Sequence, residues 1–461
     1  MSASDEILQK AGSVLTEELF LTLADGTNVD LINFVVELNL YEDIFSPCMT
    51  GSAVIADSSN LIGELPITGS EFITIKYRTP TLEDTPANVI EKSFQIYSIE
   101  NRTLNNDRET FYTIAFISIE GFIDQVSTVA KSFTESTDKL AAKIFKDYIS
   151  VNRRVDNPER KTSVVIGDVP HTSKVRYISN YWSPFKNMNF LGKRIKGATL
   201  NGADYFFFES NKNFYFISLE SLINQQLASG LFEEYVLELQ KDLIPRRQSG
   251  FNFYGNLLPS DLTRIQNMKM PNTVDILEGT LKGYHANSIR GYDLTTKRMI
   301  ESTFDYRKQI EGFIQTDTGI PIPDVPSNPF VHSKFISYNT SLYDDYGVTD
   351  HQDLPEGHPA QYMTDRIHFR QSYINSFNNF KFEIEIPGRT DIEVGALINI
   401  LYPSARSKVE DENTPDLSFD QYLSGTYLIS AIKHKFMFGD HIIIAEVIKN
   451  GLRASLGEKS D

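Results

Sequence analysis

The first quarter of the chain alternates short apolar segments with clusters of turn residues. Apolar runs at 19–23 and 31–40 lie on either side of Asp25-Gly26, a dipeptide that favours the tight turn of a β-hairpin. Further runs rich in β-branched and aromatic residues follow, with Gly, Pro, Asn and Asp between them. Such short, regularly spaced segments predict a small antiparallel barrel or sandwich. The further expected strands are 49–55, 72–77, 94–99 and 111–119.

The apolar period changes in the middle of the chain. Apolar side chains between 140 and 149 recur with helical spacing behind Ser136, which predicts an amphipathic helix. A second helix is predicted to begin with Ser183 as its N-cap and Pro184 at its first position, and to end at Asn201-Gly202. The middle region is therefore predicted to be α+β. Its next expected strands are 205–208 and 214–219.

The C-terminal part repeats the order of elements found near the N-terminus. The predicted strand 72–77 precedes a polar loop and a hairpin over 94–119, while a strand at 397–402 precedes a longer polar loop and a hairpin over 427–448. The simplest interpretation is a duplication, with two β-barrels of similar plan separated by an α+β insertion. Because identity between the two copies is slight, chance similarity of two unrelated β-domains stays open as the alternative.

The predicted fold class is thus β-rich α+β, with two antiparallel β-barrel domains separated by an α+β insertion. Within the second barrel, the alternating segment 381–386 is expected to be a strand with one buried face. The predicted organisation is an N-terminal arm at 1–13, a first barrel at 14–121, an α+β domain at 122–258 with 305–370, a second barrel at 259–304 with 371–450, and a flexible C-terminal tail at 451–461.

Length and charge narrow the possible functions. The 461 residues suffice for roughly three domains at about 150 residues each. Forty-four Lys and Arg against 61 Asp and Glu give 44 − 61 = −17, which argues against a protein that coats nucleic acid by neutralising its phosphates. No apolar run approaches the roughly 18 residues of a membrane span, and the N-terminus lacks the basic and apolar segments of a secretory signal. We therefore expect a protein made in the cytosol.

Histidine-containing groups are the first candidates for chemistry. The dense group from Asp350-His351 to Glu356-Gly-His358 contains possible metal ligands, but it lacks helical spacing, so a solvated loop is favoured over a metal site. His434 and His441 flank the turn of the C-terminal hairpin, near Lys433 and Lys435. An anion site is one interpretation of these four residues. The favoured one places both histidines on the solvated face of the hairpin.

The other candidates have ordinary structural explanations. Cys48 is the single cysteine, which excludes an intramolecular disulfide and a Cys-based zinc site, and we expect its thiol to be buried or half-buried. Acid pairs such as Glu383 with Glu385 have the composition of a glycosidase site, yet with 61 acids such pairs arise freely. Nucleotide-binding and hydrolase motifs are absent. We therefore expect no enzyme activity, no cofactor and no metal.

Basic residues gather on the second predicted helix. They fit three interpretations: a contact with an acidic partner, a contact with a phosphate, or a solvated face opposite the apolar stripe of the helix. The solvated face is favoured. These residues are Lys186, Lys193, Arg194 and Lys196.

Several segments together resemble one known family. Residues 35–47, 51–57 and 65–71 resemble the first barrel of the baseplate hub of contractile-tailed bacteriophages. Residues 394–395 and 423–429, with the hairpin that carries His434, resemble the last barrel of the same proteins. The helix from Trp182 to Leu200 and the strands after it agree in order, so the resemblance spans most of 14–450. The loop 405–421 is long for the family plan.

The resemblance implies a structural virion protein located in the tail baseplate. Hubs of this family are homotrimers in which each subunit carries two tail-tube-like barrels, so that three chains present a ring of pseudo-sixfold symmetry. One side of the ring meets the hexameric tail tube or a tube-initiator protein, the other meets the trimeric central spike protein, and baseplate wedge proteins lie around it. DNA crosses the lumen only in transit, and an acidic lining would let it pass without sticking.

The loops beside the barrel strands are the candidate interfaces of this hub. Each is also compatible with an ordinary solvated turn. Two other functions stay open: the hub of a non-viral contractile injection system, and a β-rich carbohydrate-binding or hydrolytic tail protein. The candidate interface residues are Tyr41, Glu42, Asp43, Ile44, Phe45, Arg389, Thr390, Asp391, Val394 and Gly395.

Overall fold

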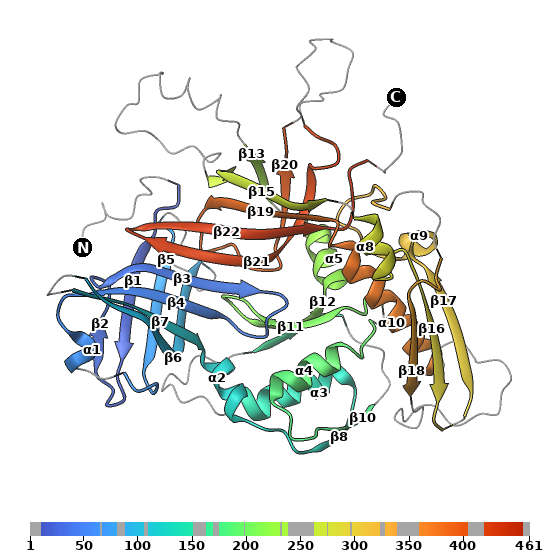
Figure 1. The fold of residues 1–461 in the computed structure, drawn as a ribbon, viewed down its shortest axis with the longest axis horizontal. Coiled ribbons are helices and arrows are strands. Elements are labelled where there is room, and N and C mark those ends of the chain that lie inside the picture. Colours follow the sequence, from blue (N-terminus) through green and yellow to red (C-terminus); the bar gives the residue numbers. More distant parts are fainter. Residues whose placement is uncertain are drawn as a thin grey trace, which may run out of the picture.

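A computed structural model of the chain is dominated by β-strands, with few helices (Figure 1). The largest sheet contains strands from both ends of the chain, and two smaller units with helices lie beside it. The structure describes residues 11–64, 67–80, 88–105, 109–150, 163–168, 175–197, 199–230, 233–237, 262–273, 275–295, 297–322, 328–338, 359–403 and 419–454.

The N-terminal half of the large sheet is antiparallel and follows the predicted strands closely. Its spatial order is β3-β4-β7-β6-β5-β1-β2. The predicted turn at Asp25-Gly26 is present, with Thr22 opposite Asn28, but the strand after it is the short β2. The predicted partner 31–40 instead contributes to β3, which pairs with β4 and β21 and not with β1. One face is buried in a core that contains Leu21, Ile75 and Phe116. The strands are β1 (Leu15–Thr22), β2 (Asn28–Asp30), β3 (Val35–Asp43), β4 (Thr50–Asp57), β5 (Phe72–Arg78), β6 (Val89–Asn105) and β7 (Glu109–Ser118), and a short helix α1 (Leu61–Glu64) follows β4.

The C-terminal half continues the same sheet, because β3 pairs antiparallel with β21. The predicted hairpin is present, and positive φ angles at Phe438 (53°) and Gly439 (82°) give it the tight turn that matches strand twist. The strands are β13 (Glu234–Leu237), β14 (Arg264–Ile265), β15 (Asn267–Thr273), β19 (Phe380–Pro387), β20 (Leu397–Leu401), β21 (Gly425–Met437) and β22 (Asp440–Lys449).

At both ends of the large sheet, strands come close to other strands of the same sheet. Only Gln266 separates β14 from β15, yet β14 pairs with β13 while β15 pairs with β19. At the other end, Ser13 forms an isolated bridge with Asp440 at the start of β22. Among the described residues we nevertheless find one continuous sheet and no closed barrel. The β-rich prediction is confirmed in this coarser form.

A helical unit follows β7, as predicted. Ser183 caps α4 by accepting the Lys186 N–H, and Pro184 occupies the first turn. Contrary to prediction, α4 ends at Gly192, where a Cβ atom would lie only 2.8 Å from the Tyr205 carbonyl oxygen. This close approach to β11 turns the chain away from the helix axis. The unit contains α2 (Ile119–Val126), β8 (Ser132–Glu135), α3 (Thr137–Ile144), a π-helical turn (Phe145–Ser150), β9 (Val164–Ile166), β10 (Val175–Ile178), α4 (Pro184–Gly192), β11 (Tyr205–Glu209), β12 (Phe214–Ser218) and α5 (Leu219–Ser229).

A separate three-stranded sheet lies at one side of the molecule, in the order β17-β16-β18 (Figure 1). Helix α10 covers one face of it, and Ser372 of that helix accepts a hydrogen bond from the Asn287 amide. Residues 286–304 were predicted to belong to the second barrel; in the structure they form β16 and β17, which pair with each other, and β16 also pairs with β18. The elements are α8 (Ile276–Leu281), β16 (Ala286–Asp293), β17 (Met299–Asp305), α9 (Tyr306–Gln309), a 3-10 turn (Ile310–Gly312), β18 (Ser333–Tyr338) and α10 (Pro359–Ser376).

Candidate interface and the polar junction beneath it

The two predicted interface loops meet at one place in the chain. Glu42, near the end of β3, accepts hydrogen bonds at Oε2 from the backbone N–H groups of Val394 (3.4 Å) and Asn211 (3.2 Å). Val394 lies in the loop between β19 and β20, and Asn211 lies in the turn between β11 and β12. A single buried carboxylate therefore connects both halves of the large sheet to the helical unit.

Two aromatic side chains form the outer surface of this meeting point. Phe45 is 50% exposed, and its ring stands edge-on to Phe206 with centroids 5.1 Å apart. Tyr41 is 38% exposed, with the Lys433 ammonium 5.7 Å from its ring centroid. Asp43 is half-buried, and burial raises the pKa of its carboxyl. Large exposed aromatic groups of this kind are typical of contact surfaces.

The second loop is held by polar contacts at its start. The Arg389 guanidinium contacts Glu233 (2.6 Å) and donates from Nε to Asp391 (3.0 Å). Thr390 is fully buried; its N–H donates to the Thr79 hydroxyl at 3.1 Å, and its own hydroxyl donates to a carbonyl of the first half. Thr390 therefore anchors the loop to the end of β5.

Half of the candidate interface residues do not reach the surface. Five of them are buried within the single chain, so they support the surface and cannot themselves touch another subunit while this fold persists. Those that reach solvent are Tyr41, Asp43, Phe45, Arg389 and Asp391. Their contact with another subunit stays a prediction. The buried ones are Glu42, Ile44, Thr390, Val394 and Gly395.

The prediction that His434 and His441 face solvent is wrong, because both are fully buried. His434 shares its strand face with Ile432 and Phe436, and the side chains of all three are buried. The period-two pattern of the strand contains this information, since residues 432, 434 and 436 must point the same way. The signal was therefore present in the sequence and was misassigned.

The two histidines and Glu42 form a chain of hydrogen bonds. His434 Nε2 lies 2.9 Å from Glu42 Oε1, and His434 Nδ1 lies 3.0 Å from His441 Nε2. Because a carboxylate oxygen only accepts, His434 donates from Nε2 to Glu42, and a single proton lies between His434 Nδ1 and His441 Nε2. Burial, and then the neighbouring His434, hold the pKa of His441 well below its ordinary value. His441 is therefore neutral in the folded chain.

A second buried contact joins the helical unit to the first half of the sheet. Lys92 Nζ lies 2.7 Å from Glu209 Oε1 and 2.5 Å from the Ser210 carbonyl oxygen. Glu209 Oε2 accepts the Met49 N–H at 2.9 Å, and the Glu209 side chain is only 3% exposed. Sequence reasoning missed this pair, because its members lie far apart in the chain and neither belongs to a motif.

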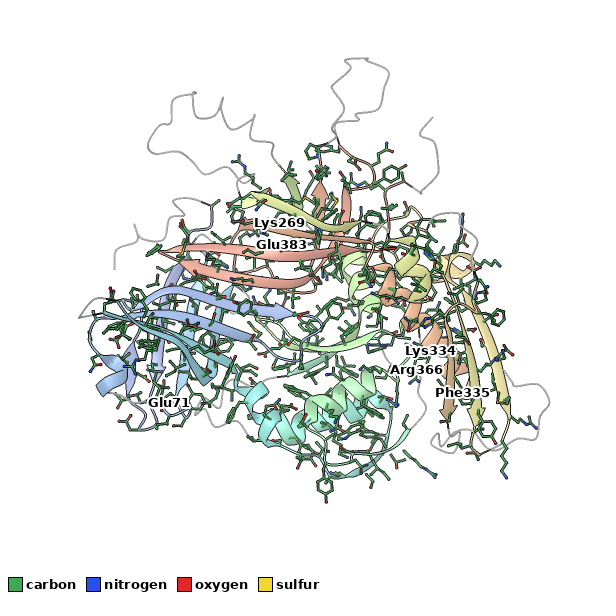
Figure 2. All side chains as sticks on the ribbon, viewed as in Figure 1. Glu71, Lys269, Lys334, Phe335, Arg366 and Glu383 are labelled. Atoms are coloured by element: carbon green, nitrogen blue, oxygen red, sulfur yellow. The ribbon has the colours of Figure 1, made fainter. Side chains whose placement is uncertain are left out.

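The other sequence candidates do not form a catalytic constellation in the described residues. Cys48 is half-buried as expected, and burial raises the pKa of its thiol to about 12, which keeps it protonated. Glu383 points outward and pairs with Lys269 at 2.9 Å (Figure 2). No group of three or more His, Cys, Asp or Glu in the described part of the chain is placed to hold a metal ion. The group at 350–358 lies outside the described residues, as do residues 404–418 of the long polar loop.

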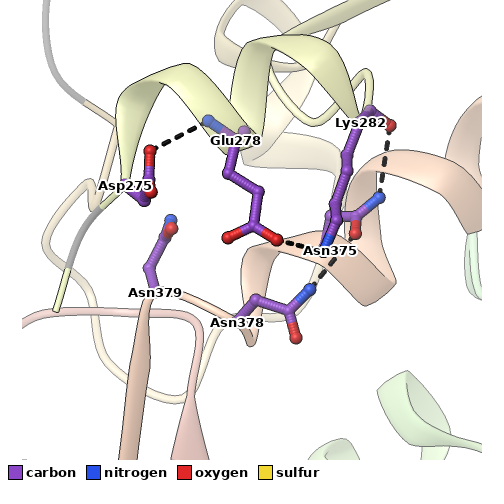
Figure 3. Close-up of a pocket in the computed structure, with 7 residues that line it drawn as sticks. Asp275, Glu278, Lys282, Asn375, Asn378 and Asn379 are labelled. Carbon is purple, nitrogen blue, oxygen red and sulfur yellow. Dashed lines mark hydrogen bonds and ion pairs between the residues drawn. The ribbon is translucent and has the colours of Figure 1, made fainter. Parts of the chain in front are cut away.

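A small polar pocket of about 130 Å³ lies between α8 and the end of α10 (Figure 3). Glu278 of α8 and Lys282, the C-cap of that helix, form an ion pair at 2.5 Å, and Asp275 caps its N-terminus by accepting the Glu278 N–H. Asn378 donates to Asn375 across the pocket floor at 3.2 Å. These polar groups contact one another, and the pocket is smaller than the roughly 300 Å³ at which small-molecule sites begin. No helix in the described parts of the chain is long and apolar enough to cross a bilayer.

Comparison with known proteins gives matches in structure alone. No family model and no curated protein matches the sequence. The tail protein from Neisseria meningitidis superposes with a TM-score of 0.51 at 8% identity, over 95% of this chain and 99% of that one. The 43 kDa tail protein of prophage MuSo2 from Shewanella oneidensis gives 0.49 at 8% identity, over 94% and 98%. A type VI secretion component of E. coli, described as similar to tail proteins of bacteriophage T4, gives 0.40 at 9% identity, over 91% and 75%. The chain thus has a tail-protein fold, and the resemblance predicted from its sequence is confirmed at the level of the fold.

Proposed function

We propose that the chain is the baseplate hub of a contractile tail, a structural protein that assembles as a homotrimer. It joins a hexameric tail tube or tube initiator to a trimeric central spike, with wedge proteins around it, and DNA passes through its lumen during ejection. Its location is the virion tail. The observation that carries the proposal is the match to a tail protein over 95% of this chain and 99% of the other, which includes both halves of the large sheet.

The strand pairings support two tube-like units in each subunit. In the C-terminal half, the segment containing β14 and β15 pairs with β13 on one side and β19 on the other, as a strand that closes a ring would. In the N-terminal half, the bridge from Ser13 to Asp440 brings the start of β1 next to β22. Three subunits with two similar units each offer six similar faces to a hexameric tube.

The surface around Tyr41 and Phe45 is the subunit interface of this proposal. Both are large exposed aromatics: Phe45 packs edge-on against the half-buried Phe206, and the Lys433 ammonium lies near the ring of Tyr41. Such rigid aromatic groups contribute much of the binding energy where subunits meet. The net charge of −17 favours passage of DNA without adhesion if the acids line the lumen.

Light scattering on the purified chain, with and without its spike protein, tests the proposal. We expect a mass near 3 × 52.4 kDa, about 157 kDa. Phe45→Ser should shift the mass towards that of one chain, whereas Phe438→Ser should not, because Phe438 is 83% exposed at the tip of the β21–β22 hairpin. Circular dichroism checks that both variants fold. A single-chain mass at micromolar concentration in every condition would contradict the hub.

The two alternatives predict different results. A hub of a non-viral contractile injection system would form the same trimer, but particles that carry it would contain no DNA. A hydrolytic tail protein would degrade a glycan and lose that activity on Glu383→Gln, whereas a structural hub would be indifferent to this change. We propose that the chain has no catalytic role, and turnover of any glycan by the purified protein would overturn this.

A further inference from the structure

A groove of about 340 Å³ runs between the end of α4, strand β18 and helix α10. Its volume falls within the range of protein ligand sites, about 300–1,000 Å³. Among the described residues that line it, three side chains are cationic, two are amides, two are aliphatic and none is a carboxylate. They are Lys193, Lys334, Arg370, Gln371, Asn375, Ile367 and Ile374.

Lys334 is the least compensated cation in this groove. Its side chain points towards α10, whereas its neighbour Phe335 points to solvent and is 66% exposed (Figure 2). The ammonium is half-buried and donates to the neutral Gln371 side-chain oxygen at 2.6 Å. Burial lowers the pKa of Lys334, with no carboxylate among the described residues to oppose the shift. A partly desolvated charge without a counter-charge is costly, and a bound anion would relieve that cost.

The other charged groups near the groove contact partners within the chain. Arg370 donates to the Ala203 carbonyl at 3.2 Å. Burial lowers the pKa of Arg370, and the nearby Asp204 opposes this shift. Asp365, also on α10, pairs with Lys196 at 3.8 Å.

At the groove mouth Lys193 is exposed, and it forms no ion pair with the described residues. The groove is therefore locally positive, although the whole chain has a net charge of −17.

We propose that this groove binds an acidic peptide segment of another protein, whose carboxylates pair with Lys334 and Lys193. The amides of Gln371 and Asn375 can hydrogen-bond to a peptide backbone, and Ile367 and Ile374 offer contact to an apolar residue beside the acids. A nucleic acid fits less well, because the overall negative charge repels a long polyanion before it reaches the groove. The proposal goes beyond the hub function and does not depend on it.

The test is fluorescence anisotropy with the full-length chain and a labelled peptide of alternating Asp, Glu and Leu. Lys334→Gln should weaken binding by about tenfold or more, the usual effect of losing one hydrogen bond to a charged group. The matched control is Lys186→Gln on α4, which also removes one positive charge but lies over Trp182, outside the groove. This control should leave affinity within about twofold, and added salt should weaken binding by the unmodified protein.

Three results would overturn the proposal. One is the absence of saturable binding of the acidic peptide at low salt. Another is equal loss of affinity in Lys186→Gln and Lys334→Gln, which would mean that only overall charge matters. The third is stronger binding of inorganic phosphate or duplex DNA than of the peptide, measured by competition, which would assign the groove to phosphate. Circular dichroism of Lys334→Gln must match that of the parent, as expected because glutamine can keep a contact with Gln371.

Discussion

Replacing Lys92 by methionine should destabilise the chain by more than the loss of packing predicts. Methionine keeps most of the volume of the lysine stem, so the change removes the ammonium and leaves little cavity. Glu209 would then stay buried, at 3% exposure, with the Met49 N–H as its remaining hydrogen-bond donor. The perturbation therefore creates an uncompensated buried charge between the first half of the sheet and the helical unit.

The magnitude follows from this environment. Removing one partner of a buried ion pair costs about 3–5 kcal/mol, and the 16% exposure of the Lys92 side chain favours the lower end, about 3 kcal/mol. Adding Glu209→Gln should recover about 1–2 kcal/mol, because glutamine is uncharged and can still accept the Met49 N–H. The double variant should thus be more stable than Lys92→Met alone.

Urea unfolding followed by the fluorescence of Trp182, the single tryptophan, measures these differences. The control is Lys269→Met, which breaks an ion pair of similar length whose side chains are 66% and 48% exposed, and which should cost less than about 1 kcal/mol. Circular dichroism should report the same order of stability. The reasoning fails if Lys92→Met costs no more than the control, or if Glu209→Gln makes Lys92→Met less stable.

Two buried groups should give opposite pH dependences. Burial lowers the pKa of His368 from 6.5 to about 4. The neutral histidine therefore contributes about 3 kcal/mol to the free energy of unfolding above pH 6.5, and this contribution falls as the pH drops towards 4. The His368→Gln variant should lose less stability than the parent between about pH 7 and about pH 4. Burial raises the pKa of Glu220 from 4.5 to about 8, so its contribution is complete below pH 4.5 and falls as pH rises towards 8. Glu220→Gln should therefore lose less stability than the parent between about pH 5 and about pH 8, and equal slopes in melting temperature would contradict either assignment.

The sequence predicted those strands, turns and helix starts that depend on neighbouring residues in the chain. The alternation in 381–386, the turn at Gly439 and the Ser183-Pro184 start of α4 all appear in the structure as expected. The end of α4 was wrong, because it depends on the approach of Gly192 to a strand that follows it in the chain. Helix α10 was missed, since several of its inward residues are polar, including Ser372 and His368, so its apolar stripe is weak.

At the junction around Glu42, the sequence predicted the segments involved but not their contacts. The resemblance located the segments around Tyr41 and Thr390, and the structure shows that the end of β3 meets the loop after β19. This meeting accompanies the pairing of β3 with β21, and these two strands are separated by most of the chain and carry no pattern that identifies one as the partner of the other. Lys92 and Glu209 are likewise far apart in the chain, and no sequence pattern indicates that they meet. The alternation within one strand indicates which side is buried, but it does not identify the distant strand or side chain that will lie against it.

The two buried polar contacts lie where the units of the chain meet. The chain of Glu42, His434 and His441 lies where β3 crosses to β21, and Lys92 with Glu209 lies where β6 meets β11. An apolar contact would tolerate sliding of one unit over another, whereas a buried hydrogen bond loses its partner when the register slips. These contacts therefore fix the relative positions of the units more than they add stability. The hub that we propose would need this property, because its tube face and its spike face must keep their alignment.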